Sequence, residues 1–162
     1  MNDKTLHTAL FVFRCVGAGT GALALASALG MEYPVWSAMS ALIVSQEKLD
    51  QTKASVFSRI LGTVIGISAA CAVNLAIGRY GASDYLQMAI ALAFCALLVH
   101  YFPQLRVSMW TCALILASPT GAPTTTIGLN RGEEVIFGTL VGGLFHAIAE
   151  GMLRLVLRRR AA

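Results

Sequence analysis

The amino-acid sequence predicts an all-α integral membrane protein with about six transmembrane helices. Of its 162 residues, 57% are hydrophobic and 12% are charged, against about 25% charged residues in an ordinary soluble domain. Long uncharged stretches recur along the chain, and several approach the roughly 20 residues that span about 30 Å of hydrocarbon. These stretches lack the alternation of a membrane strand, so we expect helices, which satisfy their own backbone hydrogen bonds.

Each uncharged stretch is assigned one helix. Arg14 interrupts the first apolar run and no small-residue cleavage site closes it, so we expect a retained helix rather than a signal peptide. The third, fourth and sixth helices follow from long apolar runs, whereas the second and fifth are unusually short. The predicted helices cover residues 6–29, 33–46, 57–77, 84–102, 105–118 and 133–157.

Two of the connections have a distinctive composition. Residues 46–58 mix charged residues with Leu49, Val56 and Phe57, which predicts a short amphipathic helix along the membrane surface. Residues 118–130 are rich in proline, glycine and threonine, which predicts a long loop on the outer side.

The positive charges predict how the chain is oriented in the inner (cytoplasmic) membrane. Short loops rich in Lys and Arg stay in the cytoplasm, and six crossings place both termini on one side. With both termini inside, only Arg79 and Arg131 fall outside. This distribution also accounts for the net charge of +4, so we expect the lipid bilayer, and no nucleic acid, as a partner. The cytoplasmic positive residues include Lys48, Lys53, Arg59, Arg106, Arg154, Arg158, Arg159 and Arg160.

No motif typical of an enzyme or a cofactor site is found in the sequence. It contains no H-E-x-x-H, no G-x-S-x-G and no phosphate-binding glycine loop. Cys15, Cys71, Cys95 and Cys112 lie singly within apolar runs, where we expect small packing residues rather than metal ligands. We therefore expect no catalytic residue, no metal and no cofactor.

Two short motifs recur at similar points in the two halves of the chain. A-L-I-V-S at 41–45 matches A-L-I-L-A at 113–117, and G-T-V-I-G at 62–66 matches G-T-L-V-G at 138–142. The matches predict two repeats of three helices. Because three is odd, the second repeat enters the membrane from the opposite side, which gives the inverted repeats of many transporters. The repeats are predicted at about 6–78 and 84–157, within a single transmembrane domain of residues 1–162.

The stretch from residue 34 to residue 66 resembles a known family. It reads Pro34-Val-Trp36, then A-L-I-V-S-Q at 41–46, a polar linker, and R-I-L-G-T-V-I-G at 59–66. It is similar to the membrane domain of the fusaric acid resistance proteins, the aromatic acid exporters, in which a Pro-x-Trp helix precedes an Arg-x-x-Gly-Thr-x-x-Gly helix. The six-helix pattern extends the resemblance over the whole chain. That family is in turn similar to plant aluminium-activated malate transporters.

The resemblance implies export of small organic anions, particularly aromatic carboxylates, driven by an ion gradient. Many members add a large soluble domain and often a second membrane domain, neither of which is found here, so we expect two copies to form a homodimer. An anion channel and a non-transporting membrane assembly subunit are the alternatives that the sequence leaves open.

Three pairs of glycines lie four residues apart, each pair on one helical face. Small residues at this spacing let helix backbones approach closely, so we expect helix packing. A narrow pathway lined by backbone, Thr63 and Thr139 is the alternative. The pairs are Gly17 and Gly21, Gly62 and Gly66, and Gly138 and Gly142.

The short second and fifth helices are the candidate substrate site, because paired short helices often mark the binding site of a transporter. Their polar side chains could solvate a carboxylate, and a tryptophan could stack on an aromatic ring. Packing within the bundle and an interfacial aromatic belt are the alternatives. The candidates are Ser37, Ser40, Gln46, Thr111 and Trp110, with Arg14, Arg59 and Arg106 as a positive cytoplasmic vestibule.

His146 and Glu150 are the candidates for proton coupling. They lie four residues apart on one face of the last helix, and titratable groups at membrane depth are often functional. The alternative is that Glu150 neutralises Arg14 or Arg154 near the cytoplasmic interface.

Overall fold

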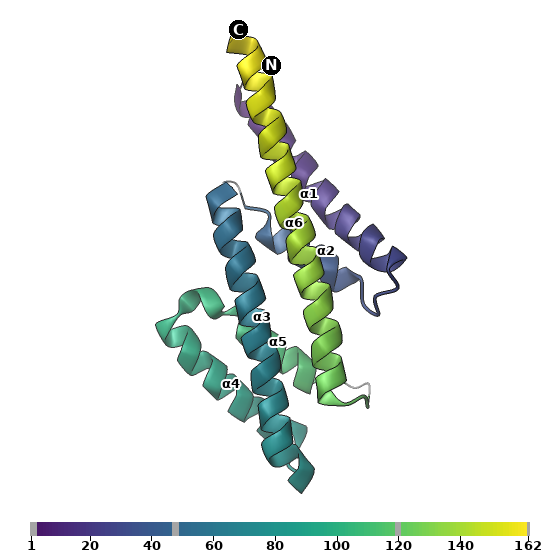
Figure 1. Ribbon diagram of the computed structural model, residues 1–162. Helices are drawn as coiled ribbons and strands as arrows, with labels where there is room; N and C mark the ends of the chain where they lie inside the picture. The colour runs from purple at the N-terminus through teal and green to yellow at the C-terminus, as the bar shows by residue number, and fades with distance from the viewer. Residues whose placement is uncertain (1–2, 47–48, 119–120, 162) are drawn as a thin grey trace. The chain divides into compact units, whose positions relative to one another are not determined.

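The computed structural model describes residues 3–46, 49–118 and 121–161, and side chains within 8–46, 50–118 and 121–153. The described chain is helical, with six α-helices in the predicted order (Figure 1). Short 3₁₀ turns, η1 (Gly78–Tyr80) and η2 (Pro103–Leu105), precede the fourth and fifth. The α-helices are α1 (Asp3–Ala28), α2 (Val35–Val44), α3 (Leu49–Ile77), α4 (Asp84–Tyr101), α5 (Val107–Leu116) and α6 (Thr124–Ala161).

Four of the described helices are long and apolar enough to cross a membrane: α1, α3, α4 and α6. The other two, α2 and α5, have 10 residues each, or about 15 Å at 1.5 Å per residue. That is about half of the hydrocarbon thickness. The predicted shortness of the second and fifth helices is therefore confirmed.

The predicted surface helix at 46–58 is wrong as a separate element. From Leu49 the chain continues without interruption into α3. No proline occurs between Leu49 and Ile77, so nothing in this stretch removes a backbone hydrogen bond or forces a kink. The charged residues of this stretch form the first turns of a long helix.

The predicted external loop at 118–130 is also wrong in its length. Helix α6 begins at Thr124, directly after Pro123, whose carbonyl accepts from the N–H of Ile127 at 3.1 Å. Proline is well suited to a helix start because its missing N–H needs no partner there. The charges of Arg131 and Glu134, which marked a boundary in the sequence, therefore lie inside α6.

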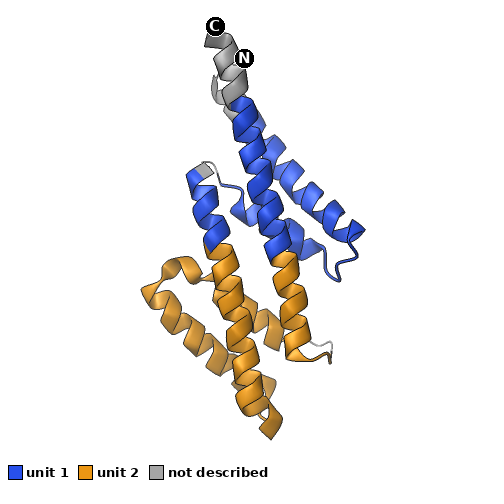
Figure 2. Cartoon of the chain, viewed as in Figure 1, with its two compact units in different colours: residues 1–57, 136–162 blue, residues 58–135 orange. Residues whose placement is uncertain are grey.

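The chain divides into two compact units that do not coincide with its sequence halves (Figure 2). Unit 1 comprises residues 1–57 and 136–162, so it contains α1, α2, the start of α3 and the later part of α6. Unit 2 comprises residues 58–135, with the rest of α3, α4, α5 and the start of α6. Each unit thus combines two consecutive helices with segments of both α3 and α6.

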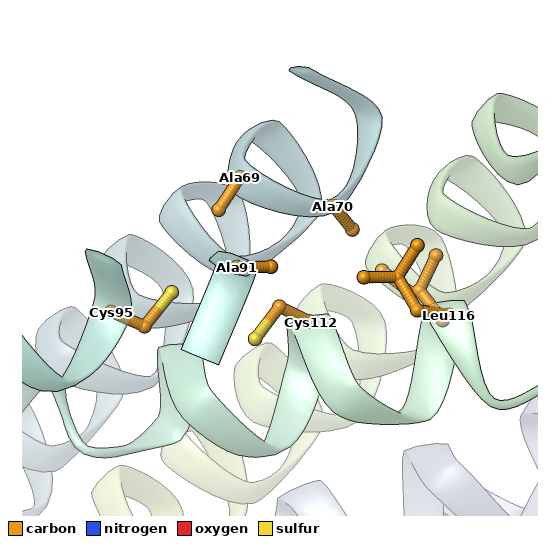
Figure 3. Packing of buried hydrophobic residues seen from close by; sticks show 7 residues of the cluster. Ala69, Ala70, Ala91, Cys95, Cys112 and Leu116 are labelled. Carbon is orange, nitrogen blue, oxygen red and sulfur yellow. The ribbon is translucent and has the colours of Figure 1, made fainter. Parts of the chain in front are cut away.

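The two units have similar internal packing. In unit 1, α1 packs against α2, and Ala18, Ala22 and Ala41 form a small core with Val141 and Phe145 of α6. In unit 2, α4 packs against α5. Its core joins side chains of α3, α4 and α5 (Figure 3). The buried members of that core are Ala69, Ala70, Ala91, Cys95, Cys112, Ile115 and Leu116.

Candidate functional site

In unit 1, the G-T-L-V-G segment of α6 packs directly on α2. A Cβ atom built on Gly138 would lie 2.5 Å from the Cα atom of Ser37, and one on Gly142 would lie 2.6 Å from the carbonyl oxygen of Ala41. Real Cβ atoms do not approach other atoms so closely, so only glycine fits at either position. Since residue numbers rise together along both helices, α2 and α6 run in the same direction.

In unit 2, the G-T-V-I-G segment of α3 packs on α5 in the same manner. A Cβ atom on Gly66 would lie 2.6 Å from the Ser108 carbonyl oxygen, and one on Gly62 would lie 3.2 Å from the Val107 side chain. Here too the numbers rise together, so α3 and α5 are parallel. In each unit a short helix is therefore held by the glycine motif of the other sequence half.

The buried faces of the two short helices have identical spacing. The buried residues of α2 are Ser37, Ser40, Ala41 and Val44, and the buried residues of α5 include Ser108, Thr111, Cys112 and Ile115. Residue 37 therefore corresponds to residue 108, one position away from the match of Ala41 with Ala113 in the sequence. The inverted relation of the two halves stays a prediction.

Of the polar residues predicted to bind substrate on these helices, Ser37 lies against Gly138 and Thr111 lies against Gly66. Ser37 and Ser40 are buried in unit 1. Thr111 is buried in unit 2, where its hydroxyl donates to the Val107 carbonyl over 3.1 Å. Trp110 is 64% exposed. Ser37 and Thr111 therefore contact the glycine motifs, and a joint substrate site between α2 and α5 stays a prediction.

The remaining glycine pair lies on α1. Cβ atoms on Gly17 and Gly21 would approach only the ring of Phe145, at 3.0 Å and 3.2 Å. A side chain can move where a backbone cannot, so these positions are less demanding than Gly138.

A closed ring of hydrogen bonds lies inside unit 1. Nη1 of Arg14 on α1 donates to Nε2 of His146 on α6 over 3.0 Å, and Nη2 donates to the backbone carbonyl of Gln46. Nδ1 of His146 lies 2.5 Å from Oγ1 of Thr52, near the start of α3. The Gln46 backbone N–H closes the ring by donating to that same Oγ1 over 3.1 Å.

The ring defines the tautomer of His146. A guanidinium group has only donors, so Nε2 must accept from Arg14 and the imidazole is neutral. Its proton then resides on Nδ1, which donates to Thr52. Arg14 and Thr52 are 7% and 1% exposed, and His146 is fully buried. A buried cation and imidazole inside membrane-spanning helices are costly groups whose presence commonly marks a functional site.

A cavity of about 350 Å³ adjoins this ring in unit 1. It lies between the start of α3 and the later part of α6, and Thr52 belongs to both the ring and the cavity wall. The lining residues are Thr52, Lys53, Val56, Thr139, Leu140, Gly143, Leu144 and Ala147. Most of these side chains are apolar, with Lys53 as the only charged group among them.

Two residues of interest were missed by sequence reasoning. Thr52 lies 94 residues from His146 in the chain, and nothing in the predicted surface helix distinguished it. Glu134 is 1% exposed inside α6, although the sequence placed it at the outer end of a helix. The uninterrupted run after Pro123 was the signal that would have placed it within the span.

The other charged residues predicted to form the vestibule are divided between the two units. Arg59 is buried and Arg106 is exposed, both in unit 2, whereas Arg14 belongs to unit 1. Their joint vestibule stays a prediction. Glu150 lies one turn beyond His146 and is partly exposed, and its part in proton coupling also stays a prediction.

The spanning helices and the buried polar ring define a multi-pass α-helical membrane protein. The chain belongs to the fusaric acid resistance protein-like family, which matches residues 20–145. Comparison with curated proteins and with solved structures yields no significant match. The family resemblance of the 34–66 stretch is thus confirmed, and the family makes this a membrane protein related to transport or resistance. The similarity to the plant malate transporters stays a prediction.

Proposed function

We propose that the protein exports small organic anions, above all aromatic carboxylates, across the inner membrane in exchange for protons. Family membership supports the transport function. The observation that carries the coupling is the Arg14–His146–Thr52–Gln46 ring, because it links a titratable group to three membrane-spanning helices. Both termini are cytoplasmic in this proposal, so the ring lies toward the cytoplasmic end of the bundle.

Protonation of His146 would open the ring. A second proton must bind at Nε2, the atom that accepts from Arg14, so that hydrogen bond cannot persist. The two positive groups would then repel each other in a medium of low dielectric constant. Glu150, one turn further along α6, offers a counter-charge to the imidazolium. Arg14 would be released from α6, and α1 could move relative to α6 while the anion leaves.

Transport measurements in proteoliposomes test this function. Neutral benzoic acid crosses lipid and collects on the alkaline side of a pH gradient, so protein-free liposomes are the reference. Exchange for protons should instead move labelled benzoate toward the acidic side, above its level in protein-free liposomes. A channel would not accumulate benzoate on the acidic side, and an assembly subunit would leave the protein-free distribution unchanged.

The coupling role is tested with His146→Gln, which keeps a hydrogen-bonding side chain but cannot titrate. This variant should lose the pH-driven accumulation, whereas His100→Gln, an exposed position on α4, should retain it. Equal gradient dependence in both variants would remove His146 from the coupling.

A homodimer is part of the same proposal, as the family resemblance implies. Native mass spectrometry in mild detergent should show two copies, and a monomer at every protein concentration would contradict it.

A further inference from the structure

We propose that the cavity between the start of α3 and α6 is the cytoplasmic binding site for the exported anion, with Thr139 as a specificity-determining residue. This inference rests on the proposed transport function. One wall of the cavity is formed by Thr52, Lys53 and Val56 of α3, and the other wall is formed by α6. Both walls belong to unit 1. We call this cavity the α3–α6 groove.

Thr139 has an unusual environment for a helical threonine. It is fully buried, yet its Oγ1 has no hydrogen-bond partner. Three other helical threonines, Thr20, Thr63 and Thr111, donate to the carbonyl four residues earlier at 2.6, 2.8 and 3.1 Å. The hydroxyl of Ser108, in α5 of unit 2, also lacks a partner, but it does not line the groove. Thr63 holds the equivalent place in the other G-T-x-x-G motif. A buried hydroxyl without a partner costs free energy, so an acceptor on a ligand would be favoured here.

Lys53 supplies the charge complementarity. Its ammonium group lies 3.8 Å from Asp50, but the two side chains are 70% and 98% exposed, so this surface pair is weak and readily exchanged for another anion. Lys53 is therefore available to a carboxylate at the rim of the α3–α6 groove.

The ammonium group of Lys53 and the hydroxyl of Thr139 lie toward opposite ends of the groove. Thr52 contacts His146 and Val56 faces Gly143, so α3 and α6 run antiparallel. Lys53 therefore lies near the level of His146, seven residues from Thr139, or about 10 Å along the helix. The flexible Lys53 side chain can shorten this span.

The ligand class follows from this separation. A benzoate with a hydrogen-bond acceptor at the para position would place its carboxylate near Lys53 and its acceptor toward Thr139. Its ring would lie among Val56, Leu140 and Leu144. The Thr139 hydroxyl would donate to the para acceptor.

Two probes of nearly equal size test the donor. 4-Methoxybenzoate carries an acceptor oxygen where 4-ethylbenzoate carries a methylene group. Equilibrium binding to the purified full-length protein, measured by calorimetry, should favour 4-methoxybenzoate by about five- to tenfold, the usual worth of one hydrogen bond. Thr139→Val, which preserves side-chain shape, should abolish that preference and leave 4-ethylbenzoate binding unchanged or tighter.

Matched variants separate specificity from folding. Thr63→Val makes the same change in the other motif and should keep the preference. Lys53→Gln should weaken the binding of both probes equally, and the loss should be larger at low salt. Arg79→Gln, at an exposed position in unit 2, should leave the binding of both probes unchanged.

Three results would overturn the assignment: no binding of either probe by wild type at millimolar concentration, no preference in wild type, or an unchanged preference in Thr139→Val. A lipid chain or a second copy of the protein filling the groove would produce one of these. Benzoate transport that persists with such a result would leave the proposed function standing and place the binding site elsewhere.

Discussion

At the scale of single residues, the unusual feature of this protein is a guanidinium group whose acceptors are supplied by distant parts of the chain. Arg14 donates to His146 and to the backbone of Gln46, and it also lies over the Phe11 ring, 5.1 Å from its centroid. A buried cation is tolerated only when such partners offset its loss of hydration. The contributions of Arg14 and His146 to the free energy of unfolding should therefore depend on each other.

A double-mutant cycle on Arg14 and His146 measures this dependence. His146→Leu removes an acceptor of a buried cation and should cost about 3 to 5 kcal/mol of unfolding free energy. The double variant with Arg14→Met removes the charge as well, so its loss should fall short of the summed single losses by about 1 to 3 kcal/mol. Reversible unfolding in mixed micelles, followed by circular dichroism, gives these values. Additive losses would show that the two residues are energetically independent.

At the scale of secondary-structure elements, the short helices are held by backbone contact rather than by large apolar side chains. Helix α2 meets α6 at Gly138 and Gly142, and α5 meets α3 at Gly66. Without a hydrophobic driving force inside lipid, close packing of this type is what keeps helices associated. The cost of replacing each glycine therefore depends on the atoms that a new side chain would meet at that position.

Gly138→Ala should be the most damaging of the glycine substitutions. The new methyl group would meet the Ser37 backbone, which cannot move without shifting α2, so we expect a loss of about 3 kcal/mol or more. Gly21→Ala should cost less because only the Phe145 ring has to rotate. A Cβ atom on Gly151, which lies in α6 as Gly138 does, would have nothing within 4 Å. Gly151→Ala should therefore raise the free energy of unfolding by about 0.5 to 1 kcal/mol. Folded yield and thermal unfolding in detergent measure the order, and equal effects at positions 138 and 151 would contradict the packing.

At the scale of the whole molecule, the contact registers within each unit give the relative directions of four helices. Helices α2 and α6 are parallel within unit 1, α3 and α5 are parallel within unit 2, and α3 is antiparallel to α6. This is the alternation expected of a six-helix topology in which even and odd helices run in opposite directions. The short helices therefore keep the alternation even though each is only half a bilayer long.

Cysteine labelling tests the orientation in the membrane. In a background without the four native cysteines, a membrane-impermeant reagent applied from the outside should react at positions 81 and 122 and should spare position 50. These three positions are exposed at helix ends, and the expected pattern follows from the cytoplasmic excess of Lys and Arg. Labelling at position 50 alone would invert the topology.

The sequence by itself determined the class of the protein, its six helices in order and its family. These follow from local properties: the length of uncharged runs, and a motif contained in residues 34–66. It also identified Arg14, His146 and the glycine pairs as residues of interest, because charge and glycine are conspicuous in apolar segments. It misjudged two boundaries, at Leu49 and Thr124, because charged residues in a helix look like a loop when hydropathy alone is read.

Only the tertiary structure decided which residues meet. Thr52 joins His146 across 94 residues, and the glycine motif of each half packs on the short helix of the other half. The buried faces of α2 and α5 align Ser37 with Ser108, one residue away from the alignment that the sequence matches suggested. The amino-acid sequence of an apolar segment does not specify this register. The unpartnered hydroxyl of Thr139 differs from its sequence equivalent Thr63 only in its surroundings. Two motifs of the same G-T-x-x-G pattern can therefore have different chemistry, because hydrogen bonding depends on neighbours that only the fold supplies.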